Sequence, residues 1–407
     1  MKSRKFIFLI LIIFLIFINT VCYASTSEPQ IYAKSAILID SNTGKVLYSK
    51  NANEKKYPAS TTKILTSILA IEKLDLNQTL TASESAISSI PSGYSNAGIK
   101  AGENLTVYEL LEAYLVHSAN EVGYILSENI SNTTEDFADL MNAKAKEIGC
   151  QNTHFTNPSG LHDENHYTTA YDLALIARYC MKNETFRKIV SLPTCTIAAT
   201  NKSGERHYSN TNEILLKNSK YYNENVIGIK TGYTKEAGNC LISAYSSDNM
   251  ELISVVLDSP ETTKEKTSGR FSDTLSIFKF AVENYKFQTI ANQNSILTSM
   301  IIKDATDDTK NLDLLLENSI EALTSTSVDI NNLEYEINLD ENIHAPISKN
   351  QVLGTVTYTI DGIKYTENLI ASHDVNLSEF WNNVFKITCT VLILIIVSFL
   401  IFTRNKK

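Results

Sequence analysis

Apolar residues follow two different periods along the first part of the chain. The segment 31–50 alternates around the turn sequence Ser41-Asn42-Thr43-Gly44, which predicts a β-hairpin. Between residues 58 and 181 the apolar positions recur every three or four residues, which predicts helices. Strand patterns return at 226–230, 238–244 and 251–257. Strands, helices and strands again, with a last helix over 271–285, are typical of an α+β domain whose antiparallel sheet is flanked by helices.

The helical part contains several segments with their own start and stop signals. A capping box of Thr106 and Glu109 predicts the start of one helix, and Gly149 predicts the end of another. The helices predicted in this part cover about 60–71, 107–116, 121–130, 134–148 and 169–181. The segment 92–98 is rich in Ser, Gly and Asn, so we expect an exposed loop there that could border a cleft.

A different pattern begins after about Asn292. Residues 333–339 alternate strictly, and 355–360 meets 363–366 across Asp361-Gly362, a dipeptide typical of a two-residue hairpin turn. We therefore predict a first domain over residues 25–290 and a small all-β domain over residues 291–375. No residues with catalytic chemistry stand out in the second domain, so we interpret it as a spacer or docking module.

Both ends of the chain carry membrane signals. The apolar run 6–18 follows the basic residues Lys2, Arg4 and Lys5, and small residues near Ala24 predict a signal peptide over 1–24. Near the other end, apolar residues predict a transmembrane helix over 385–403, after a juxtamembrane segment 376–384 and before a basic cytoplasmic tail 404–407. The two domains would then face the outer, extracytoplasmic side of the cell membrane, anchored by a single pass.

Composition limits which binding partners and which cysteine chemistry we expect. The chain has 407 residues, 43% hydrophobic and 20% charged, which is enough for a large core. A net charge of −9 leaves no polybasic surface, so nucleic acid is not an expected partner. The cysteines outside the two ends are Cys150, Cys180, Cys195 and Cys240. Their irregular spacing suggests neither zinc nor a redox pair, and although export permits disulfides, we favour buried free thiols.

The segment Pro58-Ala59-Ser60-Thr61-Thr62-Lys63 leads directly into the first predicted helix. Ser60 and Lys63 are three residues apart, so they share one face, and Ser60 lies near the positive end of the helix dipole. Apolar neighbours would desolvate Lys63 and lower its pKa, so that the pair could act as nucleophile and base. Alone the motif is weak, because Ser-x-x-Lys is frequent on ordinary helices as a capping serine and a solvated lysine.

Two more motifs follow in order: Ser118-Ala119-Asn120 and Lys230-Thr231-Gly232. With Ser60 and Lys63 they make the chain resemble the penicillin-recognising serine enzymes, whose motifs are Ser-x-x-Lys, Ser-x-Asn and Lys-Thr-Gly. The segments 157–161 and 168–174 are similar to those of the low-molecular-weight D-alanyl-D-alanine carboxypeptidases, peptidase family S11. This resemblance covers about residues 30–290, implies a serine β-lactamase/transpeptidase-like domain, and extends to the family's second domain through 346–354.

The resemblance implies a role for each motif residue. Ser60 would attack the carbonyl between two D-alanines and form an acyl-enzyme, with Lys63 as the base. Ser118 would pass a proton to the leaving amine, and Asn120 would hydrogen-bond the substrate or Lys63. The substrate-binding residues would be Lys230, Thr231, Gly232, Tyr233 and Arg270. Among them, Tyr233 would share an oxyanion hole with Ser60 through backbone N–H groups, and Arg270 would contact the terminal carboxylate.

The implied function is a membrane-anchored serine-type D-Ala-D-Ala carboxypeptidase that trims peptidoglycan stem peptides and is acylated by β-lactam antibiotics. We expect no organic cofactor and no metal, because His162 and His166 follow a turn and lack an evident third ligand. A class A-like β-lactamase is disfavoured by the lack of a Glu-x-x-x-Asn loop. A D,D-endopeptidase of cross-linked peptidoglycan and a non-catalytic cell-wall scaffold remain as alternatives. Glu121 departs from the aspartate found there in many members of the family.

Overall fold

The computed structural model describes residues 28–404 except 263, 265 and 266, and side chains as far as Ser398. The predicted signal peptide 1–24 lies outside the described residues, as does 405–407 of the predicted tail.

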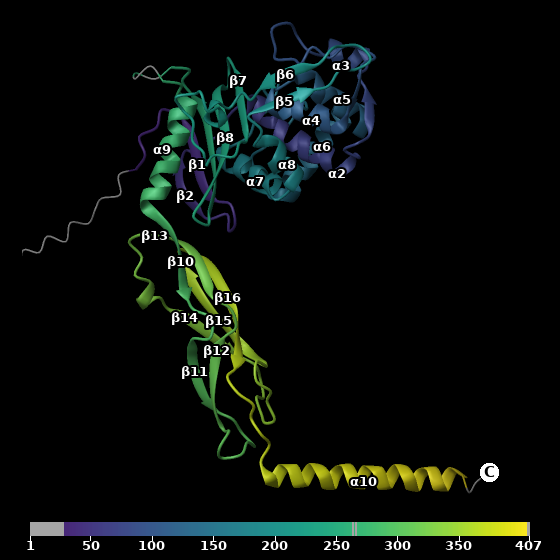
Figure 1. Ribbon diagram of the computed structural model, residues 1–407, viewed down its shortest axis with the longest axis vertical. Coiled ribbons are helices and arrows are strands. Elements are labelled where there is room, and N and C mark those ends of the chain that lie inside the picture. The colour runs from purple at the N-terminus through teal and green to yellow at the C-terminus, as the bar shows by residue number, and fades with distance from the viewer. Residues whose placement is uncertain (1–27, 263, 265–266, 405–407) are drawn as a thin grey trace, which may run out of the picture. The chain divides into compact units, whose positions relative to one another are not determined.

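A five-stranded antiparallel sheet organises the first part of the chain (Figure 1). Its strand order is β2-β1-β9-β8-β7, so the N-terminal hairpin pairs with a strand from the end of the domain. The strands are β1 (Ser35–Asp40), β2 (Val46–Lys50), β7 (Lys230–Thr234), β8 (Gly238–Ser247) and β9 (Met250–Ser259). The predicted hairpin and the predicted mixed α+β class are both confirmed.

Both faces of this sheet are covered, and alternate strand residues enter different cores. Ile37 and Ile39 point into a core shared with the group of helices. Ala36 and Leu38 point to the opposite face, where α9 (Gly269–Asn284) packs against the sheet. Figure 1 shows α9 on one side of the sheet and the other helices of this part on the other side. This period of two is what a strand buried on both faces requires.

The longer predicted helices are confirmed: 107–116 and 134–148 match the observed bounds, and the ends of the others differ from the prediction by a few residues. The helices before α9 are α2 (Lys63–Lys73), α3 (Glu84–Ser88), α4 (Val107–Val116), α5 (Asn120–Ile130), α6 (Thr134–Ile148), α7 (Ala170–Met181) and α8 (Glu184–Val190). The predicted capping box is present, since Thr106 Oγ1 accepts from the Glu109 N–H and the Glu109 carboxylate accepts from the Thr106 N–H.

Several short elements were not predicted. These are α3, α8, the 3₁₀ turns η1 (Ala59–Thr62), η2 (Glu213–Leu215) and η3 (Ile330–Asn332), and the small sheets β3 (Thr79–Thr81) with β4 (Asn104–Thr106) and β5 (Thr194–Ile197) with β6 (Arg206–Ser209). The two missed helices do carry N-cap signals, because the side chains of Ser83 and Asn183 accept backbone hydrogen bonds at their starts.

The strand expected at 226–230 is wrong in its position. Strand β7 begins at Lys230, and the segment before it makes an isolated bridge at Val226 and single backbone hydrogen bonds from Ile227 and Ile229 to β8. The cause lies at Gly228, which has a φ of +129° and approaches α8 so closely that a Cβ atom would lie 2.8 Å from the carbonyl oxygen of Val190. The chain bends there, and regular pairing with β8 starts two residues later. Lys230-Thr231-Gly232 is therefore the strand itself.

The second part of the chain is all-β, as predicted. Its sheets have the orders β11-β12-β16-β15-β14 and β10-β13. The strands are β10 (Tyr285–Ala291), β11 (Ile296–Ile301), β12 (Asn311–Leu316), β13 (Ile320–Ser325), β14 (Tyr335–Leu339), β15 (Val352–Ile360) and β16 (Ile363–Ala371). Ile360 pairs with Ile363 across Asp361-Gly362, which confirms the predicted hairpin. Its core includes Leu312, Leu314, Val356 and Leu369.

The last helix, α10 (Glu379–Arg404), contains the predicted transmembrane segment. Within the described part of the chain it is the one helix long and apolar enough to cross a membrane, over Glu379–Ser398.

Candidate active site

Ser60 lies in a tight turn that immediately precedes α2. The prediction placed it in the first turn of the helix, whereas the structure places it in the 3₁₀ turn η1, with Lys63 as the first residue of α2. Thr61 closes this turn, because its N–H and its hydroxyl both donate to the carbonyl oxygen of Pro58, at 3.2 and 2.7 Å. The turn thus presents the Ser60 hydroxyl beside the side chain of Lys63.

Lys63 joins the first two motifs through a single buried nitrogen. Its Nζ lies 2.9 Å from Ser60 Oγ, 2.7 Å from Asn120 Oδ1 and 3.2 Å from Ser118 Oγ. The side chain has no exposed surface. The structure therefore brings together all four predicted catalytic residues around one amine.

The environment of Lys63 favours its neutral form. Burial lowers its pKa well below the usual value, the positive charge of Lys230 lowers it further, and the carboxylate of Glu121 raises it in part. Burial likewise lowers the pKa of Lys230 to about 7, with a second contribution from the guanidinium of Arg270. A neutral amine within hydrogen-bond distance of a serine hydroxyl can accept its proton.

The second motif forms the connection between α4 and α5. Ser118 has a φ of +68°, a left-handed conformation that is uncommon outside glycine, and Asn120 begins α5. The Asn120 amide donates through Nδ2 to the carbonyl oxygen of Ser95 at 2.8 Å, which turns Oδ1 toward Lys63. The loop 92–98 thereby orients a residue of the site, a contact that the sequence did not reveal.

Strand β7 brings the third motif against the turn that carries Ser60. A Cβ atom on Gly232 would lie 2.9 Å from the Pro58 carbonyl oxygen and 3.1 Å from the Ser60 nitrogen. Only glycine therefore allows this close approach without a shift of the backbone. Among the described residues no strand pairs with the other edge of β7, so that edge can pair with an extended peptide.

Arg270 reaches the same cleft from the first turn of α9. Its Nη1 donates to the Gly232 carbonyl oxygen at 3.4 Å. Thr231 Oγ1 lies 2.6 Å from Thr211 Oγ1, a partner for which the sequence carried no signal. Tyr233 is 58% exposed and lines the cleft.

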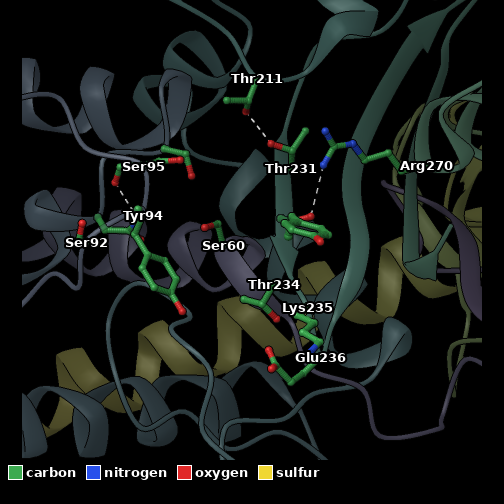
Figure 2. Close-up of a pocket in the computed structure, with 15 residues that line it drawn as sticks. Ser60, Ser92, Tyr94, Ser95, Thr211, Thr231, Thr234, Lys235, Glu236 and Arg270 are labelled. Atoms are coloured by element: carbon green, nitrogen blue, oxygen red, sulfur yellow. Dashed lines mark hydrogen bonds between the residues drawn. The ribbon is translucent and has the colours of Figure 1, made fainter. Parts of the chain in front are cut away.

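A cavity of about 500 Å³ opens over Ser60. Figure 2 shows Thr211, Thr231 and Arg270 on one side of Ser60 and Thr234, Lys235 and Glu236 on the other. Ser92, Gly93, Tyr94 and Ser95 form part of the wall, which confirms that the predicted loop borders a cleft.

The histidines considered as metal ligands are engaged in other contacts. His166 is buried, its Nε2 lies 2.9 Å from Thr62 Oγ1, and its Nδ1 accepts from the Thr156 N–H at 3.0 Å. Burial lowers its pKa to about 3, so the ring is neutral and supports the turn beneath Ser60. The ring of His162 packs edge-on against Tyr57.

The four cysteines between the chain ends are free thiols in the structure: Cys150, Cys180, Cys195 and Cys240. Burial raises the pKa of each of them, which keeps the sulfur protonated. They are therefore poor nucleophiles.

The fold is an antiparallel sheet with helices on both faces, and a serine, an asparagine and two buried lysines lie at one site. Together these features define the class of penicillin-recognising serine enzymes. The model of the D-alanyl-D-alanine carboxypeptidase family, peptidase S11, matches residues 23–261, and that of the penicillin-binding protein 5 C-terminal domain matches 285–377. The chain belongs to the peptidase S11 family of D-alanyl-D-alanine carboxypeptidases.

Individual relatives agree with this assignment. The D-alanyl-D-alanine carboxypeptidase DacF of Bacillus subtilis is 36% identical over 354 residues, which is 86% of this chain and 87% of that protein. The crystal structure of penicillin-binding protein 5 from Haemophilus influenzae is 29% identical, with a TM-score of 0.65 over 86% of this chain and 99% of that one. A D-alanyl-D-alanine endopeptidase of Pseudomonas aeruginosa is 30% identical over 57% of this chain and 73% of its own length.

Proposed function

We propose that this protein is a membrane-anchored carboxypeptidase that removes the terminal D-alanine from peptidoglycan stem peptides through an acyl-enzyme on Ser60. The observation that carries the proposal is the 2.9 Å separation between Ser60 Oγ and the buried, pKa-lowered Nζ of Lys63. A serine next to a desolvated amine is an activated nucleophile.

In the acylation step, Lys63 accepts the Ser60 proton while Oγ attacks the carbonyl carbon between the two D-alanines. The negative charge that develops on the carbonyl oxygen is stabilised by the backbone N–H groups of Ser60 and Tyr233. The close approach of Gly232 to the Ser60 nitrogen supports this role, because it brings the β7 backbone next to that N–H.

The bond to the leaving D-alanine breaks when its nitrogen receives a proton. Lys63 holds that proton after the attack, and Ser118 Oγ, 3.2 Å from Nζ, provides the relay to the leaving nitrogen. Free D-alanine departs, and a water molecule then attacks the ester carbonyl. Lys63 takes the proton of this water and returns it to Ser60 Oγ, so that the shortened peptide leaves and the enzyme is regenerated.

The terminal carboxylate of the substrate binds at the side of the cleft that carries positive charge. Lys230 and Arg270 supply that charge, and Thr231 supplies a hydroxyl whose orientation is set by Thr211. A planar guanidinium suits a carboxylate, and a buried lysine adds attraction where water is largely excluded. Asn120 remains available to the substrate backbone at the opposite wall.

For the chain ends, we propose cleavage after Ala24 and a membrane span over 385–403 after the juxtamembrane segment. Between them we propose a catalytic domain over 25–290 and a small β domain over 291–375. The apolar helix α10 and the basic residues of 404–407 support a single-pass anchor with the catalytic domain on the outer face. In this arrangement the β domain is a spacer between the membrane and the cleft.

A D,D-endopeptidase activity is the second candidate, because one relative carries that name. That relative matches just over half of this chain, whereas the DacF relative matches both domains, which favours the carboxypeptidase. The scaffold reading is disfavoured, because residues of all three motifs line one cleft and Lys63 contacts Ser60 and Asn120 there.

The test uses membranes that contain the full chain, a fluorescent penicillin, and a D-Ala-D-Ala-terminated peptide. We expect the wild type to be labelled and to release D-alanine, and Ser60→Ala to do neither, while Ser85→Ala on the exposed surface of α3 behaves as wild type. Labelling without D-alanine release would instead support the endopeptidase. A folded wild type that shows neither signal would exclude the enzyme.

A further inference from the structure

A buried carboxylate lies behind the site, and the proposed mechanism does not use it. Glu121 follows Asn120 in the first turn of α5 and is only 2% exposed. Asn120 contacts Lys63 directly, so this carboxylate is one residue away from a ligand of the proposed base. Fully buried glutamates are rare in proteins unless a partner compensates their charge.

One carboxylate oxygen of Glu121 has a partner and the other does not. Oε1 accepts from the Ala97 N–H at 2.6 Å, which fixes the side chain against the loop 92–98. Oε2 is buried without a hydrogen-bond partner, and no cationic nitrogen lies within 4.0 Å of either oxygen, among the residues that the structure describes. No ion pair therefore neutralises this carboxylate.

The other titratable groups around Glu121 do not supply the missing positive charge. The Arg206 guanidinium is paired with the Glu103 carboxylate. The ring of His117 packs against that of Tyr208, and burial lowers the pKa of this histidine and raises the pKa of the tyrosine, which favours the neutral form of both. Lys63 is left as the cation on which Glu121 can act.

Lys63 lies between two groups of opposite charge. The oxygens within hydrogen-bond distance of its Nζ are uncharged, and they belong to the hydroxyls of Ser60 and Ser118, the Ser118 carbonyl and the Asn120 amide. The ring of Tyr114, whose pKa is raised by burial, is neutral as well. Beyond these groups, Lys230 on β7 lowers the pKa of Lys63, and Glu121 on α5 raises it.

We propose that Glu121 is the counter-charge of the ammonium group that forms on Lys63 when Ser60 attacks the substrate. The inference rests on the carboxypeptidase function and adds a positioning residue to it. In this step the Ser60 proton moves to the Lys63 nitrogen, the bond from Oγ to the carbonyl carbon forms, and the carbonyl π electrons move to the oxygen. A positive charge appears on Lys63, and the buried carboxylate stabilises it.

The distance between the two groups suits this role. Burial and Lys230 together outweigh Glu121, since the pKa of Lys63 stays well below its usual value. The amine is therefore neutral before the attack and can accept a proton. Burial raises the pKa of Glu121 too, while backbone N–H groups and the charge of Lys63 lower it in part. The carboxylate is thus favoured most when Lys63 becomes charged.

The experiment removes the charge of Glu121 and keeps the length of its side chain. Full-length wild type, Glu121→Gln and Glu121→Met in detergent are labelled with a fluorescent penicillin across pH, in a stopped-flow instrument. Without the carboxylate, we expect the midpoint of the acid limb of the acylation profile to fall by about one pH unit. The plateau rate should fall about three- to fivefold, because a weaker base accepts the proton less readily.

Two further variants separate charge from structure. Glu121→Asp keeps the charge and should keep the wild-type midpoint, even if the shorter side chain loses its contact with Ala97. Glu112→Gln, at a half-buried position on α4 outside the cleft, should keep both the midpoint and the rate. The shift in the neutral variants should persist in about 0.5 M salt, because salt screens buried charges only weakly.

The outcomes distinguish this proposal from the function on which it rests. Neutral variants that are slower but keep the wild-type midpoint would show that Glu121 acts only on structure, which overturns the proposal. An equal shift in Glu121→Asp would also overturn it. Glu121→Met leaves no buried amide unpaired, so it carries the test if Glu121→Gln does not fold. A folded wild type that neither reacts with penicillin nor releases D-alanine would contradict the carboxypeptidase itself.

Discussion

Asn120 Oδ1 lies 2.7 Å from Lys63 Nζ, and its orientation is determined by a residue in another part of the chain. The Asn120 amide nitrogen donates to the carbonyl oxygen of Ser95, and the Asn120 backbone N–H donates to the same oxygen at 3.0 Å. Since a carbonyl can only accept, the amide has one orientation here, with its oxygen toward the lysine. A neutral acceptor next to Lys63 positions the amine without adding a negative charge.

The first prediction concerns the absence of charge on the Asn120 side chain. Asn120→Asp would place a carboxylate beside Lys63, raise the pKa of the amine, and oppose the Ser95 carbonyl oxygen. We expect acylation by penicillin at pH 7 to slow by about a hundredfold, as for loss of a general base. The pH at which acylation reaches half its maximum should rise. Stopped-flow labelling across pH measures both.

A second asparagine, at the surface, serves as the control for the negative charge that the Asn→Asp change adds. Asn218→Asp, at an exposed position outside the cleft, should leave the acylation rate and its pH profile unchanged. An Asn120→Asp enzyme whose profile coincides with that of the wild type would show that Lys63 does not serve as the base.

The second prediction concerns the turn that holds Ser60. Gly160 has a φ of +78°, and a Cβ atom there would lie 1.8 Å from the carbonyl oxygen of Ala59. Gly160→Ala must therefore displace the turn, and we expect a loss of about 3 kcal/mol or more in the free energy of unfolding, with penicillin labelling largely lost. Gly98 has a φ of +63° with no atom within 4 Å of such a Cβ, so Gly98→Ala should cost only about 1 kcal/mol.

Urea unfolding and labelling of the two variants separate steric displacement from backbone strain. If the two variants lost the same free energy of unfolding, the turn at Ser60 would be able to shift at little cost. Gly160 would then be needed only because of its positive φ.

Local signals in the sequence were enough for the long helices and for the three motifs. Helix α6 was predicted over its observed range because its apolar period, its N-cap Thr133 and its C-terminal Gly149 all agree. The β15–β16 hairpin was equally clear from Asp361-Gly362 and the alternation on both sides. At these positions neighbouring residues determine the structure.

The features that the sequence did not predict depend on contacts between distant segments. Strand β7 was shifted because the packing of Gly228 against Val190 is invisible in the sequence. Thr211 beside Thr231, and Ser95 beside Asn120, are contacts between loops and motif residues that follow no periodic rule. The sequence therefore predicted the side chains of the site that belong to a motif. It did not predict the residues that hold those side chains in place.

The third prediction concerns the pH dependence of stability. The pKa of Lys230 is lowered to about 7 in the folded protein by burial and by Arg270, whereas in the unfolded chain it has its ordinary value near 10.5. Between these values the unfolded state binds one more proton at this side chain, so its contribution makes stability rise with pH. Below about pH 7 both states are protonated, and the penalty for the buried charge is present in full.

Lys230→Met removes this group and keeps an apolar side chain of similar length. We expect the difference in unfolding free energy between variant and wild type to shrink by about 1 kcal/mol per pH unit from pH 7.5 to 9.5. Urea titrations at several pH values measure it. A difference that does not vary with pH would show that Lys230 keeps its ordinary pKa in the folded protein.

The fourth prediction concerns the support of the loop 92–98. Glu103 has no exposed surface, and its Oε1 lies 2.5 Å from Arg206 Nη2, while Arg206 Nη1 donates to the carbonyl oxygen of Ala97 at 3.3 Å. Glu121 accepts from the Ala97 N–H at 2.6 Å. The half-buried Arg206 and the buried Glu121 thus hold the segment whose Ser95 orients Asn120.

Arg206→Met leaves the Glu103 carboxylate buried without its cation, and removal of one partner of a buried pair costs about 3–5 kcal/mol. Arg206→Met combined with Glu103→Gln should recover part of that loss, because no charge then stays buried and unpaired. The recovered stability need not restore the loop, since the contact with Ala97 is still missing. We therefore expect penicillin acylation to remain slow in the double variant, whereas full recovery of the acylation rate would show that Arg206 acts only on stability.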